Sequence, residues 1–330
     1  MNEQITSNQH FVPRFYLKNF ADVSNKVHIL DVKNGRLSNP KSPSKVGREK
    51  FFYAQKTGVF DEASQIVEEY FKLLEDQFAK RLPIIIDKIL HVEQNLDEDD
   101  KYFLSLFMCT LWLRSPYRRE QMNCMQEDFL KEIASRDPDR ILRSIDKLPE
   151  EEQNKLIETM EKKDYRLQFD NSQHLQFMMT TMGIDGPGFT NMFFGMKWKI
   201  YINKTSKKFI TSDSPVVEYW DPPKIFYGPS FLSRKKYFAL TPNIFIKLSY
   251  PHGSDKIKRK TLFENDVKKV DFLNILIADH VFQYAYSLDE EILKKMIEGK
   301  KGMGEVEMYY YKNYFLPWRE YNNKRMVKNI

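Results

Sequence analysis

The sequence has little of what marks several common protein classes. It contains two cysteines, Cys109 and Cys124, both in segments with helical patterns, so a disulfide framework and a Cys-x-x-Cys metal site are excluded. No apolar run approaches the length of a membrane-spanning helix, and 30% of the residues are charged. The opening segment Met1–Gln9 lacks the basic start and the apolar stretch of a secretory signal. We therefore expect a cytoplasmic protein that does not cross a membrane.

Complete catalytic motifs are also missing. The chain has no Gly-x-Ser-x-Gly, no His-Glu-x-x-His, and no acidic pair followed by Glu-x-Lys as in common nuclease cores. The three glycines between Gly183 and Gly188 lack the spacing and the trailing Lys-Thr/Ser of a phosphate-binding loop. The six histidines are scattered, so a histidine-rich metal site would have to be assembled by folding.

The residues that are present suffice for a large core. The chain has 330 residues, of which 42% are hydrophobic and 14% aromatic. We predict an α+β fold in one domain with three subregions. These are an N-terminal hairpin cap (residues 1–57), a helical body (58–195), and a C-terminal antiparallel sheet with a packed helix (196–330).

The helical body is predicted from apolar periodicity. A helix begins near Asp61, and its apolar residues recur at intervals of three and four, which indicates one buried face. Pro83 breaks or kinks this segment. The helix Tyr102–Leu113 is apolar nearly all round and therefore belongs in the centre of the fold.

The strands are predicted from alternation and turn signals. Val27–Val32 followed by Asn34-Gly35 indicates a hairpin in the cap. Lys197–Ile202 alternates, and we expect it to pair in a second hairpin with Lys208–Thr211. Further strands are expected at residues 216–220, 236–240 and 244–250, an amphipathic helix at about 264–286, and a final extended segment from Met308.

Charge allows a polyanionic partner. Fifty-two basic residues face forty-six acidic ones, which gives a net charge of +6 and a pI near 8.9. Lys and Arg attract phosphates, so nucleic acid or a nucleotide is a candidate partner. Proteins that bind small molecules carry similar excesses, so the charge alone leaves both classes open.

His10 and Arg114 are the first two polar side chains of interest. His10 precedes a short amphipathic helix after Pro13, and its imidazole either caps local backbone groups or acts in acid–base chemistry or substrate binding. Arg114 follows the buried helix directly, so its charge needs a carboxylate, backbone carbonyls or a ligand phosphate. A structural ion pair and an anion site are both open for Arg114.

Two carboxylates, Glu75 and Asp213, are the next polar side chains of interest. Glu75 lies beside the buried face of the helix that begins near Asp61, where it either pairs with a base or is exposed. Asp213, in Ser212-Asp213-Ser214-Pro215, follows a strand, so it either faces a cleft or caps a turn. Glu75 and Asp213 could together hold a divalent cation such as magnesium against a phosphate, with Arg114 neutralising charge and His10 moving a proton.

Several motifs in combination resemble a known family. The run His-x-x-Pro-x-x-Tyr-Leu-x-x-Phe at 10–20, Arg-Ser-Pro at 114–116, Thr-Ser-Asp-x-Pro at 211–215, Leu-Thr-Pro at 240–242 and the late-helix Asn274 are similar to the bacterial domain-of-unknown-function family forty-two thirty-eight. The resemblance spans nearly the whole chain. It implies a shared polar site at His10, Arg114, Asp213 and Asn274, with no reaction attached.

These observations lead to two functional hypotheses. The first is a hydrolase of phosphodiester bonds in RNA or DNA, acting in host defence or as a toxin. The second is a non-enzymatic nucleotide- or anion-binding module, and a polar core with a purely structural role is a third reading. For the hydrolase, the expected catalytic residues are His10, Asp213 and Glu75, the expected substrate-binding residues are Arg114, Asn274 and Ser212, and the expected metal ligands are Glu75 and Asp213.

Overall fold

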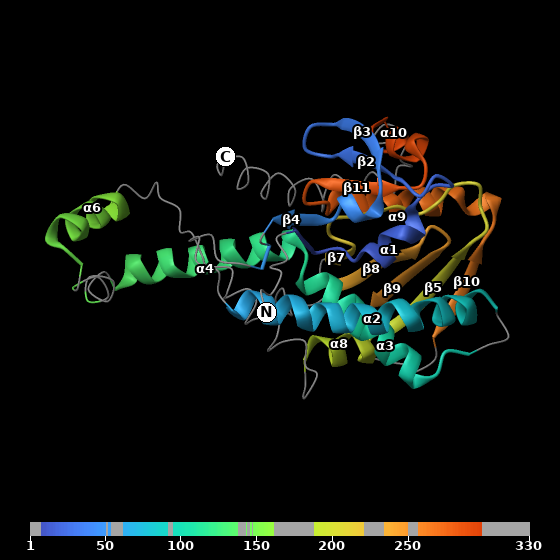
Figure 1. Ribbon diagram of the computed structural model, residues 1–330, viewed down its shortest axis with the longest axis horizontal. Helices are drawn as coiled ribbons and strands as arrows, with labels where there is room; N and C mark the ends of the chain where they lie inside the picture. Colours follow the sequence, from blue (N-terminus) through green and yellow to red (C-terminus); the bar gives the residue numbers. More distant parts are fainter. Residues whose placement is uncertain are drawn as a thin grey trace, which may run out of the picture.

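The computed structural model contains two larger sheets with helices packed around them (Figure 1). It describes residues 8–50, 52–53, 62–91, 95–137, 143, 146, 148–161, 188–220, 234–249 and 257–298. Helices and mostly antiparallel strands are mixed along the chain, so the predicted α+β class is confirmed. The extended segment expected from Met308 lies outside the described residues.

A five-stranded sheet forms the C-terminal part of the fold, in the order β10-β5-β9-β8-β7. Neighbouring strands are antiparallel except β10 and β5, which are parallel. Alternation predicted all of these strands but β10, whose Lys-Arg-Lys start carries no apolar signal. The strands are β5 (Lys197–Asn203), β7 (Val216–Trp220), β8 (Arg234–Thr241), β9 (Ile244–Ser249) and β10 (Lys258–Leu262).

A four-stranded sheet joins the two ends of the described chain. The predicted hairpin is present as β2 and β3, and β2 also pairs with the late strand β11 in the order β3-β2-β11-β6. Pro40 is tolerated in β3 because that strand is at the sheet edge and needs no second partner. The strands are β2 (Val27–Asp31), β3 (Arg36–Lys41), β6 (Thr211–Ser212) and β11 (Tyr284–Ser287), and a separate pair is formed by β1 (Asn8–His10) and β4 (Arg48–Lys50).

The hairpin expected between Lys197–Ile202 and Lys208–Thr211 is wrong. Strand β5 pairs with β9 and β10, whereas β6 crosses to the four-stranded sheet and pairs with β11. The intervening turn is held by Asn203, whose side-chain amide donates to the Lys207 carbonyl at 2.7 Å. Alternation identifies a strand, but the partner of that strand depends on contacts distant in sequence.

The helix expected at 264–286 is shorter. It consists of the 3-10 turn η4 (Glu264–Asp266) and helix α9 (Val267–Asp279), and the chain then turns into β11. The apolar residues Val270, Leu273 and Ile277 are buried on the inner face of α9, as expected. The helix ends at His280 because the next residues bind the carboxylate of Asp213, as described below.

The helical layer is centred on α3 (Glu98–Leu113), which is buried along most of its length and packs against α8 and β7. Its first turn is capped by Asp97, which accepts from the Asp100 amide at 2.7 Å. Pro83 does not end its helix, because α2 (Glu62–Leu90) continues through it. The remaining helices are α1 (Arg14–Leu17), α4 (Pro116–Arg136), α6 (Glu150–Glu161), α8 (Phe189–Gly195) and α10 (Glu290–Glu298), with 3-10 turns η1 (Lys18–Phe20) and η2 (Pro43–Lys45).

Figure 1 shows α2, α3 and α8 on one side of the five-stranded sheet, with α4 and α6 extending away from the sheets. No helix in the described part of the chain is long and apolar enough to cross a membrane.

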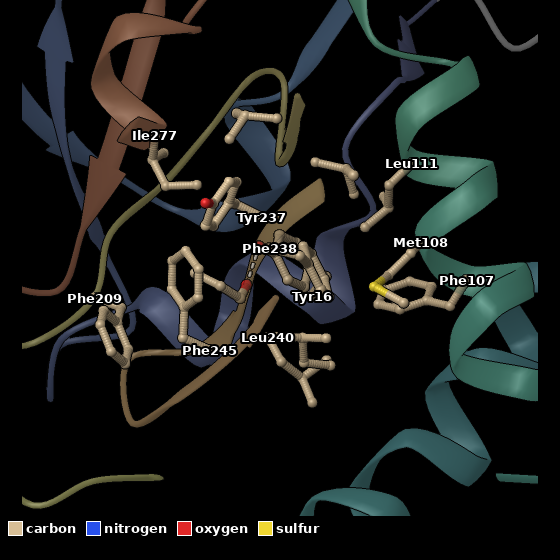
Figure 2. Packing of buried hydrophobic residues seen from close by; sticks show 14 of the residues in the cluster. Tyr16, Phe107, Met108, Leu111, Phe209, Tyr237, Phe238, Leu240, Phe245 and Ile277 are labelled. Atoms are coloured by element: carbon tan, nitrogen blue, oxygen red, sulfur yellow. Dashed lines mark hydrogen bonds between the residues drawn. The ribbon is translucent and has the colours of Figure 1, made fainter. Parts of the chain in front are cut away.

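The N-terminal α1 is anchored in the core between the helices and the sheet (Figure 2). The Tyr16 ring stacks on Phe238 of β8 with centroids 5.5 Å apart and meets Phe107 of α3 edge-on at 5.9 Å. Its hydroxyl lies 2.6 Å from the Ala239 carbonyl and 2.7 Å from Thr211 Oγ1. Tyr16 therefore ties the opening segment to both larger sheets.

Gly35 and Gly47 both have positive φ, but only Gly47 is also tightly surrounded by other atoms. A Cβ at Gly47 (φ +63°) would lie 3.0 Å from the Cβ of Val12, whereas Gly35 (φ +60°) has nothing within 4 Å. We expect Gly35→Ala to lower the free energy of unfolding by about 1–2 kcal/mol from the positive φ alone. Gly47→Ala should cost a further ~1–3 kcal/mol from overpacking. Urea denaturation of both variants checks this, and equal losses would contradict it.

Candidate functional site

The opening segment is fixed in place before it reaches the site. Strand β1 pairs with β4, and the Gly47 carbonyl accepts from the amides of Phe11 and Val12 at 3.0 and 3.1 Å. The helix predicted after Pro13 is present, with Leu17 and Phe20 fully buried. This anchoring brings the backbone carbonyl of His10 to Arg114 at the end of α3.

Arg114, at the end of α3, is the centre of a polar cluster. Its side chain is 1% exposed, yet all three of its nitrogens have partners. Nε donates to the Tyr53 hydroxyl at 2.8 Å, and Nη1 donates to Glu75 Oε1 at 2.7 Å. Nη2 donates to the His10 carbonyl, which also accepts from the Tyr53 hydroxyl at 3.2 Å. Arg114 therefore has a carboxylate and a backbone carbonyl as partners, two of the three kinds its burial required.

Aromatic rings enclose the same guanidinium. Its carbon lies 4.4 Å from the centroid of Phe71 and 5.8 Å from that of Tyr53. A cation over the faces of buried rings is stabilised electrostatically, and the rings exclude water from it. Glu75 lies at the edge of the cluster, where its side chain is 25% exposed to solvent. We call Arg114, Tyr53, His10, Glu75 and Glu68 the Arg114 cluster.

Glu68 lies seven residues before Glu75, on the same face of α2. Burial raises the pKa of Glu68 to about 7, with a smaller lowering by Arg114 and a raising by Glu75. Its Oε2 is buried without a hydrogen-bond partner among the described residues. Near neutral pH this carboxyl is therefore divided between its acid and its carboxylate form.

His10 is shifted in the opposite sense. Burial, then the positive charges of Arg114 and Arg48, lower the pKa of His10 to about 4, although a hydrogen bond with the Ser44 backbone raises it. Its Nε2 is buried and has no hydrogen-bond partner among the described residues. The imidazole is therefore neutral at pH 7.

Glu68 and His10 therefore differ in protonation in a way that suits proton transfer. Both sense the charge of Arg114, and environments that push two pKa values apart are how enzymes assign an acid and a base. The cluster holds a neutral ring nitrogen, a carboxyl group that titrates near pH 7, and a fixed positive charge. A neutral imidazole and a carboxyl group that titrates near pH 7 are group types used in general acid–base catalysis.

Asp213 lies in a second cluster, where β6 meets the end of α9. Its Oδ1 accepts from the Phe282 amide at 2.9 Å, and its Oδ2 accepts from the amides of Gln283 and Tyr284 at 2.7 and 2.8 Å. Burial raises the pKa of Asp213 to about 6, against the lowering by these three amides. The described contacts thus make Asp213 the group that organises the turn into β11.

Asn274 and Ser212 also bind backbone. Asn274, 3% exposed on α9, accepts from the Ile210 amide at 3.0 Å and donates to the Lys208 carbonyl at 2.9 Å. Ser212 Oγ accepts from the Ser214 amide at 3.1 Å. Of the six residues selected from the sequence, the contacts bring His10, Glu75 and Arg114 together, and they place Ser212, Asp213 and Asn274 around the segment that links the two sheets.

The comparison with protein families settles the resemblance. The model of a family described as a protein of unknown function, DUF4238, matches residues 8–291. The chain belongs to DUF4238. Its match runs from β1 into α10 and so includes both polar clusters. No curated protein and no solved structure matches the chain.

The two carboxylates expected to share a metal in this DUF4238 protein have other partners. Glu75 binds Arg114, and both oxygens of Asp213 are taken by three amides. Among the described residues, no group of three or more His, Cys, Asp and Glu side chains is placed to hold a metal ion. Carboxylate oxygens engaged by N–H donors have less capacity left for a cation. The described contacts of Glu75 and Asp213 therefore do not support a metal ion shared between them.

Sequence reasoning missed Glu68 and Tyr53 of the Arg114 cluster, and also Gln9, which binds the Tyr53 backbone. Glu68 could have been found from its seven-residue spacing to Glu75, which places both on one helix face. Gln9 is fully buried and its Oε1 accepts from the Tyr53 amide at 2.7 Å, but nothing in the sequence indicates this pairing. Tyr53 was not selected from the sequence, and its hydroxyl accepts from Arg114 Nε.

Removing the guanidinium should be severely destabilising. Arg114→Met removes the cation paired with Glu75 and one of the two donors to the His10 carbonyl, so we expect a loss of about 3–5 kcal/mol in the free energy of unfolding. The control is Arg136→Met, because Arg136 is 78% exposed and pairs with Glu132 on the same helix; its loss should stay below ~1 kcal/mol. Urea denaturation of the two variants gives the comparison, and a loss for Arg114→Met as small as the control's would refute the role.

Glu68 should make stability fall as pH rises. Its pKa is about 7 in the folded protein against 4.5 ordinarily, so the unfolded chain releases this proton first and stabilisation is lost from pH 4.5 to 7. Glu68→Gln should remove this loss, worth up to about 3 kcal/mol for a shift of this size. Thermal unfolding of wild type and variant between pH 5 and 8 measures it. Glu69→Gln, at an exposed neighbour on α2, should leave the wild-type pH dependence unchanged.

Proposed function

We propose that this DUF4238 protein hydrolyses phosphodiester bonds in RNA or DNA at the Arg114 cluster. One observation carries the proposal: His10 Nε2 and Glu68 Oε2 are both buried and unpaired among the described residues, and both groups sense the charge of the same guanidinium. Buried polar atoms without partners are rare in folded proteins and require an explanation. Ordered water or a bound substrate can supply such partners, and the proposal assigns this part to the substrate.

The two groups have complementary parts in such a reaction. Neutral His10 accepts a proton from the attacking water, whose oxygen forms the new bond to phosphorus. Protonated Glu68 donates its proton to the leaving oxygen as the phosphodiester bond breaks. The proton on His10 then returns to Glu68 through solvent, which restores the starting state. Arg114 is 1% exposed and held by Glu75 and Tyr53, so it contributes a fixed positive charge behind His10 and Glu68 rather than a direct contact with the phosphate.

The overall charge supports a phosphate-bearing substrate. The net charge of +6 favours approach of a polyanion. The same proposal places the activity in the cytoplasm, in host defence or as a toxin, where cleavage of RNA or DNA would be the effective step.

The expected pH dependence is specific. The active form has His10 deprotonated and Glu68 protonated, so kcat/KM should rise through pH 4 and fall through pH 7, following the pKa values of about 4 and about 7. Purified protein is incubated with end-labelled single-stranded RNA and DNA, with and without magnesium, and cleavage rates are measured from pH 3.5 to 9. A profile flat across pH 7 would contradict the role of Glu68.

Variants separate the two groups. His10→Asn and Glu68→Gln should each lower the rate by about 10²–10⁴, and Glu68→Gln should also lose the alkaline limb of the profile. Glu69→Gln is the matched control and should leave the rate unchanged. Substrate binding without cleavage by the wild type at any pH would instead favour the second candidate, a non-enzymatic nucleotide- or anion-binding module.

A further inference from the structure

Arg48 lies beside His10 on one face of the β1–β4 pair. The two residues are partners in register. The Phe11 amide donates to the Gly47 carbonyl, and the His10 carbonyl accepts from Arg114, so no backbone hydrogen bond joins His10 to Arg48. In antiparallel pairs of this kind the side chains stand close together, with Cβ atoms about 4.5–5.5 Å apart. The register therefore places the Arg48 side chain alongside the imidazole.

A second exposed arginine acts on the same imidazole. Arg14 is the first residue of α1, and its positive charge lowers the pKa of His10, as do the charges of Arg48 and Arg114. Arg14 and Arg48 are exposed, whereas His10 is half-buried. Because Arg114 is enclosed behind His10, the two exposed arginines are the cations of this group that a ligand can reach from solvent.

The two exposed guanidinium groups have no bonded counterion. In the described part of the chain, the side chains of Arg14 and Arg48 form no hydrogen bond and no ion pair. Arg119 shows the contrast, because it binds Glu49 at 3.0 Å. Glu49 is the one acidic residue of β1 and β4, and alternation places it on the opposite face of the pair from Arg48. The face that carries His10 therefore presents positive charge to solvent.

The imidazole of His10 is oriented for the same ligand. A hydrogen bond with the Ser44 backbone raises the pKa of His10, so the ring donates and the Ser44 carbonyl accepts. Nε2 has no hydrogen-bond partner among the described residues, and the donor is therefore Nδ1. This bond leaves the lone pair on Nε2, which is the atom that can take a proton. A phosphate bound by the two exposed arginines would lie beside this nitrogen.

We propose that Arg48 and Arg14 bind the scissile phosphate of an RNA or DNA strand and hold it against His10. A guanidinium presents a planar fork of N–H donors that matches phosphate oxygens. The two positive charges also stabilise the negative charge that develops on these oxygens as water attacks. The inference rests on the proposed function for the identity of the substrate, and it assigns the direct phosphate contact that buried Arg114 does not make.

Binding measured without turnover tests the assignment. A short fluorescent RNA strand and the matching DNA strand are titrated with full-length Glu68→Gln protein, which lacks the proposed acid. In that background, Arg48→Gln and Arg14→Gln should each weaken binding about tenfold or more, because each removes a charge-assisted hydrogen-bonding group. Arg48→Lys should recover part of the affinity, since lysine keeps the charge but lacks the planar fork.

Arg36→Gln is the matched control. Arg36 is also exposed and also begins a strand, but its strand β3 belongs to the four-stranded sheet, so binding should stay unchanged. Thermal unfolding of each variant verifies that it is folded. An equal loss of binding in Arg36→Gln would overturn the assignment, as would unchanged binding in Arg48→Gln or Arg14→Gln. Binding of inorganic phosphate without binding of either strand would also overturn it.

Cleavage is measured separately, so the two proposals can fail independently. Loss of strand binding in Arg48→Gln and Arg14→Gln, without cleavage by the wild type, would refute hydrolysis and leave the two arginines as the binding site of a non-enzymatic module. Cleavage by the wild type together with unchanged binding in Arg48→Gln would refute the arginine site and leave the proposed hydrolysis standing.

Discussion

One buried positive charge, the guanidinium of Arg114, constrains the rest of the structure because it must be given partners inside the protein. The Arg114 side chain is 1% exposed, and its three partners come from segments far apart in sequence: β1, the short stretch with Tyr53, and α2. A buried charge without partners is very costly. The N-terminal segment, α2 and the end of α3 are therefore held in one arrangement, because any other would leave the guanidinium without part of its hydrogen bonding.

Burial, together with the same charge, shifts the pKa values of the two groups near Arg114. Arg114 lowers the pKa of His10 in addition to the effect of burial, and it only partly offsets the burial that raises the pKa of Glu68. His10 and Glu68 thus titrate in the reverse of their order in water. The second polar cluster has a different task, since Asp213 and Asn274 use their side chains to fix backbone where the chain passes between the sheets.

The two faces of the five-stranded sheet differ in polarity. The face toward Tyr16 and α3 is filled by apolar side chains and the buried ion pair of Glu218 and Arg118. The other face carries Lys199 and Lys247, which are paired across β5 and β9. Alternation in the sequence places Lys199 and Lys247 outward from the core. It does not reveal that they are neighbours, because the pairing of β5 with β9 joins positions almost fifty residues apart.

Local patterns in the sequence determined the elements and the family. The apolar periodicity of α3, the alternation of β7, β8 and β9, and the hairpin β2–β3 follow from side-chain spacing, which is a local property. His10, Glu75 and Arg114 could be selected because charged groups beside apolar segments need partners. Only the tertiary structure decided which partners they took, that Glu68 joins them, and that β6 leaves β5 for β11. Those outcomes depend on burial and on long-range pairing, which sequence spacing does not encode.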